Sequence, residues 1–214
     1  TNVPLARIAA QIATGKKLKD FNLPSWDMIN HVSVKEAVLP FNKFPEESIF
    51  LSPEMKSTGE VMGISKTFGE SFKRAIISSG NKIFYKGTVF FSVNDPDKLN
   101  AIPIARDLQE LGYKIVATDG TSLELNRNGI TAKTVFKVGE GRPNILDHIM
   151  NNEIQMVINT PLGSKSRYDE EAIGRACIQK GIMAITTLSG ANAAVRAIRS
   201  RKRKTVKSLQ SYHS

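Results

Sequence analysis

The stretch KIVATDGTSLEL, residues 114–125, joins an apolar run, a small polar turn and the start of a helical pattern. Its apolar part, Ile115-Val116-Ala117, has the continuous hydrophobic character of a strand that is buried on both faces. The run stops at Thr118-Asp119-Gly120-Thr121, and the helix-compatible Ser122-Leu123-Glu124-Leu125 follows directly. A strand, a polar turn and a helix in this order are common in α/β architecture, and they are also a common way to bind a phosphate.

The same alternation of strands and helices continues on both sides of this stretch. We predict strands at residues 88–93, 114–118, 134–138, 155–160 and 183–187. Helices are predicted at 121–128, 144–151, 169–180 and 189–201, and an earlier helix ends near residue 111. That earlier helix either starts with Pro103 at its first position or follows a separate turn. Because the strands are continuous apolar runs, they predict an α/β fold with a five-stranded parallel sheet flanked by helices.

Residues 1–80 have a different character. The segment PLARIAAQIATG (4–15) predicts a short helix that ends at Gly15, and a proline-rich region follows it. A second helix is predicted in TFGESFKRAIIS (67–78), where Thr67 and Glu70 have the spacing of a capping box. Since this half offers few apolar runs, we expect it to be mostly helical or irregular and to be the edge of something larger. The linker to the α/β domain is placed at residues 81–87, and the α/β domain at 88–202.

Composition excludes several classes of protein. The 214 residues are 41% hydrophobic, and no apolar run of about 18 residues is present to cross a membrane. A single cysteine, Cys177, rules out a disulfide framework within the chain. The first residues, Thr1 to Pro4, show neither an initiator Met nor a signal peptide, so we expect an internal cut in a longer cytoplasmic polypeptide.

The formal net charge is +10, and seven of the 30 basic residues lie in RAIRSRKRKTVK, residues 196–207. Such a run forms a solvated tail or face, or it binds nucleic acid. No aromatic residues interleave it and no nucleic-acid-binding module surrounds it, so we do not expect nucleic acid as a partner. Part of the excess positive charge can instead serve a compact anionic ligand.

Polar residues recur where the predicted strands end. In an open parallel sheet the ligand crevice lies outside the carboxyl ends of the strands, so these residues form the candidate phosphate site. The set combines hydroxyls, an amide, a glycine that allows close backbone approach, and cations: Ser92, Lys98, Thr118, Gly120, Thr121, Lys137, Arg142, Asn159 and Thr160. Alternatively, Thr121 only caps its helix and Gly120 only turns the chain.

The motifs also bear on the kind of ligand. A G-x-G-x-x-G loop and a Walker A loop are both absent, which favours a single phosphate over a dinucleotide or triphosphate. The three histidines, His31, His148 and His213, form no pair or triad by spacing, so we expect no metal site. Asp119 can act as a base, although an aspartate in a turn more often bonds the backbone. Binding without chemistry fits these residues best.

Several strings resemble the large subunit of carbamoyl phosphate synthetase. VKEAVLPFNKFP (34–45) and LSPEMKSTGEVMGI (51–64) are similar to the end of its second ATP-grasp half. The strings ATDGT, VFKVGEGRPNILDHI, VINTPLG and ITTLSGA resemble its allosteric domain, which has a methylglyoxal-synthase-like fold. The resemblance covers nearly the whole chain. It implies that residues 1–80 are the remnant of the ATP-grasp domain and that 203–214 are the usual C-terminal tail.

The resemblance also implies a function. The parent enzyme makes carbamoyl phosphate for pyrimidine and arginine synthesis from bicarbonate, ATP and ammonia that a glutaminase small subunit delivers. It uses ATP with Mg²⁺ or Mn²⁺ upstream of Thr1, so this chain should hold no cofactor and be inactive alone. Its expected partners are the rest of an oligomeric large subunit and a nucleotide monophosphate effector, UMP as inhibitor or IMP as activator. The effector positions of the family fall on the strand-end set, from Ser92 to Thr160, with Arg142 added from its motif.

Some positions depart from the family pattern. Pro161 replaces a second threonine after Asn159-Thr160. Ala184-Ile185 replaces a Tyr-Asp pair of some members, whose tyrosine ornithine activation uses, so ornithine control is not expected here. Glu36 and Thr186 match the ornithine-related or interdomain positions, and we favour the interdomain role for Glu36. The alternative function is a stand-alone methylglyoxal-synthase-type phosphate lyase, but the string that carries the catalytic aspartate of those enzymes is missing.

Overall fold

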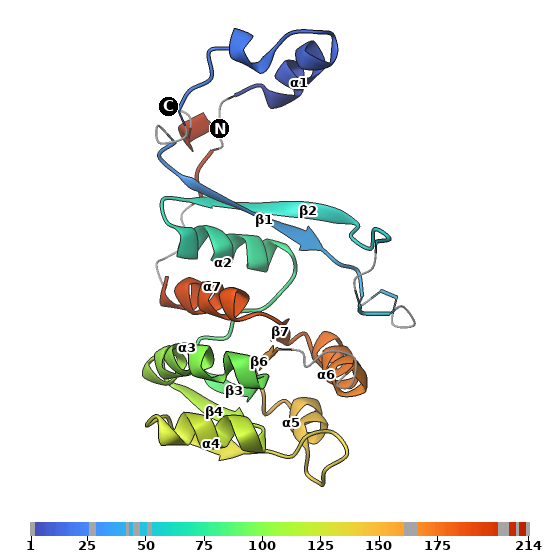
Figure 1. The fold of residues 1–214 in the computed structure, drawn as a ribbon, viewed down its shortest axis with the longest axis vertical. Coiled ribbons are helices and arrows are strands. Elements are labelled where there is room, and N and C mark those ends of the chain that lie inside the picture. The colour runs from blue at the N-terminus through green and yellow to red at the C-terminus, as the bar shows by residue number, and fades with distance from the viewer. Residues whose placement is uncertain are drawn as a thin grey trace.

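A computed structural model describes residues 3–25, 29–41, 43–44, 48–50, 53–160, 167–200, 206–208 and 210–212. Figure 1 shows an α/β layer system at one end of the molecule and a smaller sheet with helices at the other. The larger sheet contains β3 (Gly87–Ser92), β4 (Tyr113–Ala117), β5 (Ala132–Thr134), β6 (Met156–Asn159) and β7 (Met183–Ile185). All neighbouring strands are parallel, in the order β5-β4-β3-β6-β7. The predicted five-stranded parallel α/β fold is therefore confirmed.

Helices cover both faces of this sheet, as continuous apolar strands require. They are α3 (Lys98–Glu110), α4 (Asp119–Arg127), α5 (Ile145–Met150), α6 (Arg167–Lys180) and α7 (Leu188–Arg199). Alternate residues of the central strand β3 enter two separate cores. Val89 and Phe91 pack with α3, α4 and α7, whereas Phe90 packs with α5 and α6. The three side chains have no solvent exposure, which explains why the strand reads as one apolar run.

Two predicted elements need correction. The third strand was expected at residues 134–138 and lies at 132–134, because the Asn126 side chain receives the N–H of Ala132 at 3.1 Å and donates to its carbonyl at 2.9 Å. For α3, the predicted alternative of a separate turn before the helix is confirmed by the 3-10 turn Asp95–Asp97, whereas Pro103 lies inside α3 and not at its first position. A proline there leaves the carbonyl four residues earlier unpaired, and the exposure of Leu99 on that turn allows water to satisfy it.

The first 80 residues contain α1 (Leu5–Ala13), α2 (Phe68–Ser78) and two strands that we did not expect. β1 (Val32–Val38) pairs antiparallel with β2 (Gly59–Ser65), although a segment of 20 residues separates them in the sequence. The expectation of a mostly helical or irregular region therefore missed this sheet. At the start of α2, the Thr67 hydroxyl accepts from the Glu70 N–H at 3.4 Å, whereas the Glu70 carboxylate accepts from the Ser65 hydroxyl at 2.5 Å. Only half of the expected capping box forms.

Helix α2 lies between the small sheet and α7 of the α/β layers (Figure 1). The Ser71 hydroxyl donates to the Val32 carbonyl at 2.7 Å, and Lys73 donates to the carbonyl of Ser200 just beyond α7. A Cβ on Gly69 would lie 2.5 Å from the Arg196 carbonyl oxygen, so only glycine permits this helix approach. Residues on both sides of the expected linker are thus in contact, and the division at 81–87 stays a prediction.

The C-terminal tail also contacts the first 80 residues. The Tyr212 hydroxyl donates to the carbonyl of Ile64 in β2 at 3.3 Å, and its ring meets that of His31 edge-on, with centroids 5.8 Å apart. Of the basic run at 196–207, residues 201–205 lie outside the described residues. The Arg196 guanidinium stacks over the Phe68 ring at 4.5 Å, and Arg199 pairs with Asp107 at 2.7 Å. These two arginines therefore serve packing and pairing within the molecule.

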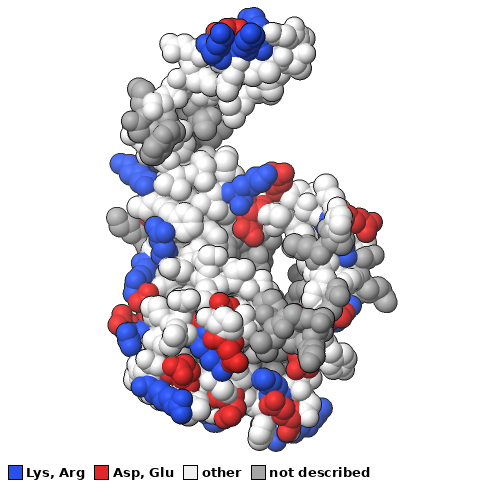
Figure 2. Space-filling view, in the orientation of Figure 1, with Lys and Arg blue, Asp and Glu red and all other residues white. Residues whose placement is uncertain are grey.

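The surface in Figure 2 carries acidic and basic side chains next to each other over the α/β layers. Such mixing is typical of a solvated surface and gives no single basic face in that view. Among the described helices, none is both long and apolar enough to cross a bilayer.

Candidate anion-binding site

Five of the predicted phosphate-site residues line one cavity at the carboxyl edge of the large sheet: Ser92, Thr118, Lys137, Asn159 and Thr160. The cavity measures about 50 Å³. About 10–15 Å³ of such space holds one water molecule, so the cavity suits one compact anion or a few waters.

The strand register brings these residues together. Ser92 and Asn159 are the last residues of β3 and β6 and form a pair in the parallel ladder. The ladder bonds continue one residue further, because Thr118 N–H donates to the Phe91 carbonyl at 3.1 Å and Thr160 N–H donates to the Ser92 carbonyl at 3.0 Å. The backbone pairing of β4, β3 and β6 thereby fixes the positions of four of the five residues, Ser92, Thr118, Asn159 and Thr160.

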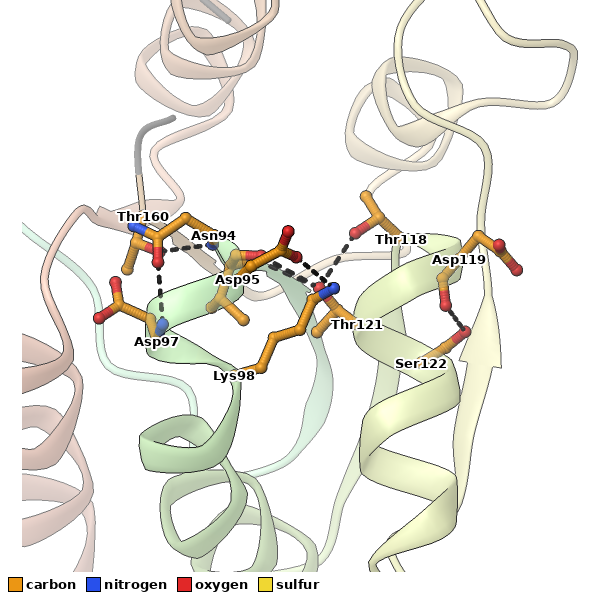
Figure 3. Close-up of polar contacts among 10 residues, drawn as sticks. Asn94, Asp95, Asp97, Lys98, Thr118, Asp119, Thr121, Ser122 and Thr160 are labelled. Atoms are coloured by element: carbon orange, nitrogen blue, oxygen red, sulfur yellow. Dashed lines mark hydrogen bonds and ion pairs between the residues drawn. The ribbon is translucent and has the colours of Figure 1, made fainter. Parts of the chain in front are cut away.

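The cavity residues retain hydrogen-bonding capacity. Within the described part of the chain, the Ser92 hydroxyl and the Asn159 amide make no side-chain hydrogen bond, and Lys137 makes no ion pair. The Thr160 hydroxyl oxygen accepts from the Asn94 N–H at 3.0 Å, which leaves its own hydrogen free to donate (Figure 3). The cavity thus presents a cationic amine and three neutral donors, the group types that bind a phosphoryl oxygen.

Thr121 and Thr118 hold the end of β3 to the start of α4. Thr121 is 2% exposed, and its hydroxyl oxygen accepts from the Val93 N–H at 3.3 Å and from the Thr118 hydroxyl at 3.2 Å. Figure 3 shows these contacts behind the Lys98 side chain. Thr121 does not line the cavity. Its hydroxyl bonds hold the turn that carries Thr118 to the end of β3. Thr121 lies inside α4, whose N-cap is Thr118, so it does not cap the helix as the structural alternative had it.

Lys98 and Gly120 also lie next to the cavity and not on its lining. The Lys98 ammonium pairs with the Asp95 carboxylate at 2.6 Å (Figure 3). A Cβ on Gly120 would lie 3.0 Å from this ammonium, so the glycine leaves room for the lysine. The bond from Lys98, with the charge of Lys137 as a further cause, holds the pKa of Asp95 below its ordinary value. Lys98 is therefore neutralised locally, whereas Lys137 is not.

The other predicted residues lie elsewhere. The Arg142 side chain is 82% exposed and bonds Asp147 at 3.2 Å near the start of α5. Thr186 is exposed beyond β7, and Glu36 lies on β1, where burial raises the pKa of its carboxyl group. None of the three lines the cavity. The structure thus places Arg142 away from the strand-end cluster, and the roles of all three residues stay predictions.

The sequence reading missed two carboxylates that line the cavity, Asp169 and Glu170 in the first turn of α6. Burial raises the pKa of Asp169, while the positive charge of Lys137 opposes the rise and the charges of Glu140 and Glu170 add to it. Acidic residues are common in the first turn of a helix because they interact favourably with the helix dipole. The sequence pattern therefore gave no reason to assign these two residues to a binding site. Phe90, Val138, Ile145 and Ile173 complete an apolar wall.

Among the described residues, neither a cysteine nor a histidine lines this cavity. Cys177 is buried in α6, and burial raises the pKa of its thiol to about 12, so the reactive thiolate does not form at neutral pH. His148 pairs with Glu153 at 2.6 Å. The Asp119 carbonyl accepts from the Ser122 hydroxyl at 2.9 Å (Figure 3). Within the described residues, no three His, Cys, Asp or Glu side chains group as a metal site.

Comparison with known proteins agrees with this fold. Residues 100–186 match the family model described as MGS-like domain. Three of the most similar relatives are carbamoyl phosphate synthase large chains. The proteins from Acidobacterium capsulatum and Archaeoglobus fulgidus are each 48% identical over all of this chain and 20% of their own length. The one from Nostoc sp. is 46% identical over 99% of this chain and 19% of its own length. The chain therefore spans about one fifth of the length of these curated relatives.

Proposed function

Because the chain is a relative of carbamoyl phosphate synthase large chains and carries an MGS-like domain, we propose that it is a regulatory region that binds a phosphorylated effector. The effector is a nucleoside monophosphate, with UMP as inhibitor or IMP as activator. Its phosphoryl group occupies the cavity at the carboxyl ends of β3, β4 and β6. The base and the ribose of the nucleotide lie outside the cluster of strand-end side chains that holds the phosphoryl group.

The observation that carries this proposal is the position of Lys137. Lys137 lines the cavity together with Ser92, Asn159 and Thr160, and no carboxylate of the described residues pairs with its ammonium at salt-bridge distance. A strand-end cavity with an unneutralised cation suits a small anion, whereas the paired Lys98 and Arg142 are occupied. A charge-assisted hydrogen bond contributes about 1.5–3 kcal/mol, so this one lysine can dominate the affinity.

The wider function belongs to a longer protein. We propose that the complete large chain, with a glutaminase small subunit, makes carbamoyl phosphate from bicarbonate, glutamine-derived ammonia and ATP, and that ATP and Mg²⁺ or Mn²⁺ bind outside this chain. Effector binding then favours one arrangement of the regulatory region against the synthetase part. A coupling free energy of about 1–3 kcal/mol is enough for such control.

Calorimetric titration of the 214-residue chain with UMP, IMP and inorganic phosphate tests the proposal. We expect binding of at least one nucleotide and a loss of about 10- to 100-fold in affinity on Lys137→Ala, from the magnitude of a charge-assisted bond. The matched control is Lys114→Ala, since Lys114 is an exposed lysine at the opposite end of β4. Equal losses in the two variants, or no binding by the parent chain, would remove the proposal.

Asp169 favours a second candidate function, a phosphate lyase of the methylglyoxal synthase type. Such a reaction needs a carboxylate base close to bound phosphate, and Asp169 lines the anion cavity. Incubation with dihydroxyacetone phosphate and detection of methylglyoxal separate the two functions. Robust turnover that Asp169→Asn abolishes would replace the regulatory assignment, whereas turnover at the uncatalysed rate would leave it in place.

A further inference from the structure

The cavity that suits an anion also contains negative charge of its own. Asp169 and Glu170 line it together with Lys137, and in the described residues no hydrogen bond or salt bridge holds the Asp169 carboxylate. A second like charge inside so small a space opposes anion binding. The two carboxylates on the lining are therefore not explained by electrostatic complementarity between the cavity and an anion.

The groups around Asp169 define the electrostatic problem. Lys137 attracts its carboxylate, and Glu140 and Glu170 repel it. The Glu140 carboxylate is engaged, since it accepts from the Lys137 backbone N–H at 3.1 Å. The neighbouring helix α5 packs on α6, but its Asp147 and His148 pair with Arg142 and Glu153, and β7 carries no titratable side chain. Among the charged groups that act on Asp169, Lys137 alone attracts its carboxylate, so an anion that engages Lys137 meets the charge of Asp169 directly.

A dianion in the cavity changes the electrostatic partner of Lys137. In the free protein Lys137 offsets the burial of Asp169, and a bound anion takes over that interaction. Asp169 then loses its stabilising cation and faces two new negative charges. A like charge nearby raises the pKa of a carboxyl group, just as an opposite charge within about 4–6 Å lowers it by about 1–3 units. The free protein already has this pKa raised, so a further rise brings it toward neutral pH.

We propose that anion binding in this cavity is coupled to the uptake of one proton by Asp169, so that the regulatory region binds its effector more tightly as the pH falls. The proton neutralises Asp169 and leaves Lys137 free to contact the anion. The inference rests on the proposed function, because it concerns the same cavity. It adds a pH-dependent term to effector control.

Sulfate is the probe of choice, because it keeps both charges between about pH 5 and about pH 8 and so does not titrate itself. Titration calorimetry of the 214-residue chain in buffers of different ionisation enthalpy gives both the affinity and the number of protons taken up. We expect the number of protons taken up per sulfate to be largest at a pH between the free and bound pKa values of Asp169. We also expect the affinity to fall about tenfold for each pH unit between the free and bound pKa values of Asp169.

Asp169→Asn separates this inference from a generic charge effect. The variant should bind sulfate about tenfold or more tightly at neutral pH, without proton uptake and with a flat pH dependence. The control is Glu171→Gln, the same loss of charge on the same helix, at a carboxylate that pairs with Arg175 at 2.8 Å and does not line the cavity. The control should keep both the proton uptake and the pH dependence of the parent chain.

The outcomes are distinguishable. If sulfate binds, depends on Lys137 and takes up no proton, with Asp169→Asn unchanged, the coupling is overturned and the effector site survives. If sulfate binds to neither the parent chain nor Asp169→Asn at any pH, the proposed function and this inference both fail. Equal effects of Asp169→Asn and Glu171→Gln would show a long-range charge effect and would also overturn the coupling.

Discussion

Gly69→Ala tests whether α2 joins the small sheet to the α/β layers as closely as the structure has it. A methyl group on residue 69 would lie 2.5 Å from the Arg196 carbonyl oxygen, about 0.9 Å closer than the 3.4 Å at which ordinary contact begins. The atom it meets is backbone, so relief requires that α2 and α7 move apart. That movement also disturbs the Arg196 guanidinium above the Phe68 ring.

The expected cost follows from these contacts. Overpacking a close backbone contact costs about 1–3 kcal/mol, and alanine recovers up to about 1 kcal/mol of helix propensity over glycine. We therefore expect Gly69→Ala to lower the free energy of unfolding by about 1–2 kcal/mol. For a chain of this size the thermal midpoint should fall by about 3–6 °C.

Urea unfolding followed by circular dichroism measures this change, and Gly120→Ala is the matched control. The nearest atom to a Cβ on Gly120 is the mobile end of Lys98 at 3.0 Å, so the side chain can move aside. We expect the control to stay within about 0.5 kcal/mol of the parent chain. Equal stabilities of the two variants, or a more stable Gly69→Ala, would refute the close approach of α2 and α7.

Three further predictions concern the site, the half-buried Glu36 and the buried Cys177. Ser92→Ala removes one neutral donor from the cavity, so we expect the dissociation constant for inorganic phosphate to rise about 2- to 10-fold in calorimetry, and no change would exclude Ser92 from the site. Burial raises the folded-state pKa of Glu36, so its carboxyl group favours folding below its ordinary pKa and loses that contribution as the pH rises through the raised value. Glu36→Gln should therefore stabilise the chain at neutral pH and not at pH about 3 in parallel urea titrations, and the reverse order would contradict the burial. Cys177, with its pKa near 12, should react with a thiol reagent only as fast as the chain opens, whereas rapid labelling of the native protein would contradict its place in the core.

The α/β half was predictable because its strands and helices are local patterns. Each strand is a short apolar run that ends in polar residues, and the helices between them fix the strands as parallel. Strand ends in a parallel sheet meet at one edge, which is why Ser92, Lys137 and Thr160 could be grouped from the sequence alone. Their contacts with a ligand remain predictions.

The parts that were missed depend on distant partners. β1 and β2 pair across a segment of 20 residues, and charged residues such as Lys35 and Glu60, which bond at 2.8 Å, interrupt their apolar pattern. Strand propensity is judged from one segment at a time, so it does not include the stabilisation that a strand gains from its partner in the sheet. The same holds for Asp169, whose position opposite Lys137 follows from how α6 packs on the sheet.

The choice among the predicted cations also required three dimensions. Lys98, Lys137 and Arg142 look equivalent as strand-end charges in the sequence. In the structure Lys98 pairs with Asp95 and Arg142 with Asp147, which leaves Lys137 as the cavity cation. Both acidic partners lie within five residues of their cation, so an i,i+3 or loop pairing is a signal that a closer reading of the sequence could have used.

A crystal structure of the chain with UMP or inorganic phosphate tests the central claim most directly. We expect a phosphorus atom at the carboxyl ends of β3 and β6, with phosphoryl oxygens within hydrogen-bonding distance of the Lys137 ammonium and the Ser92 and Thr160 hydroxyls. Bound phosphate at any other place, with water alone beside Lys137, would contradict the account.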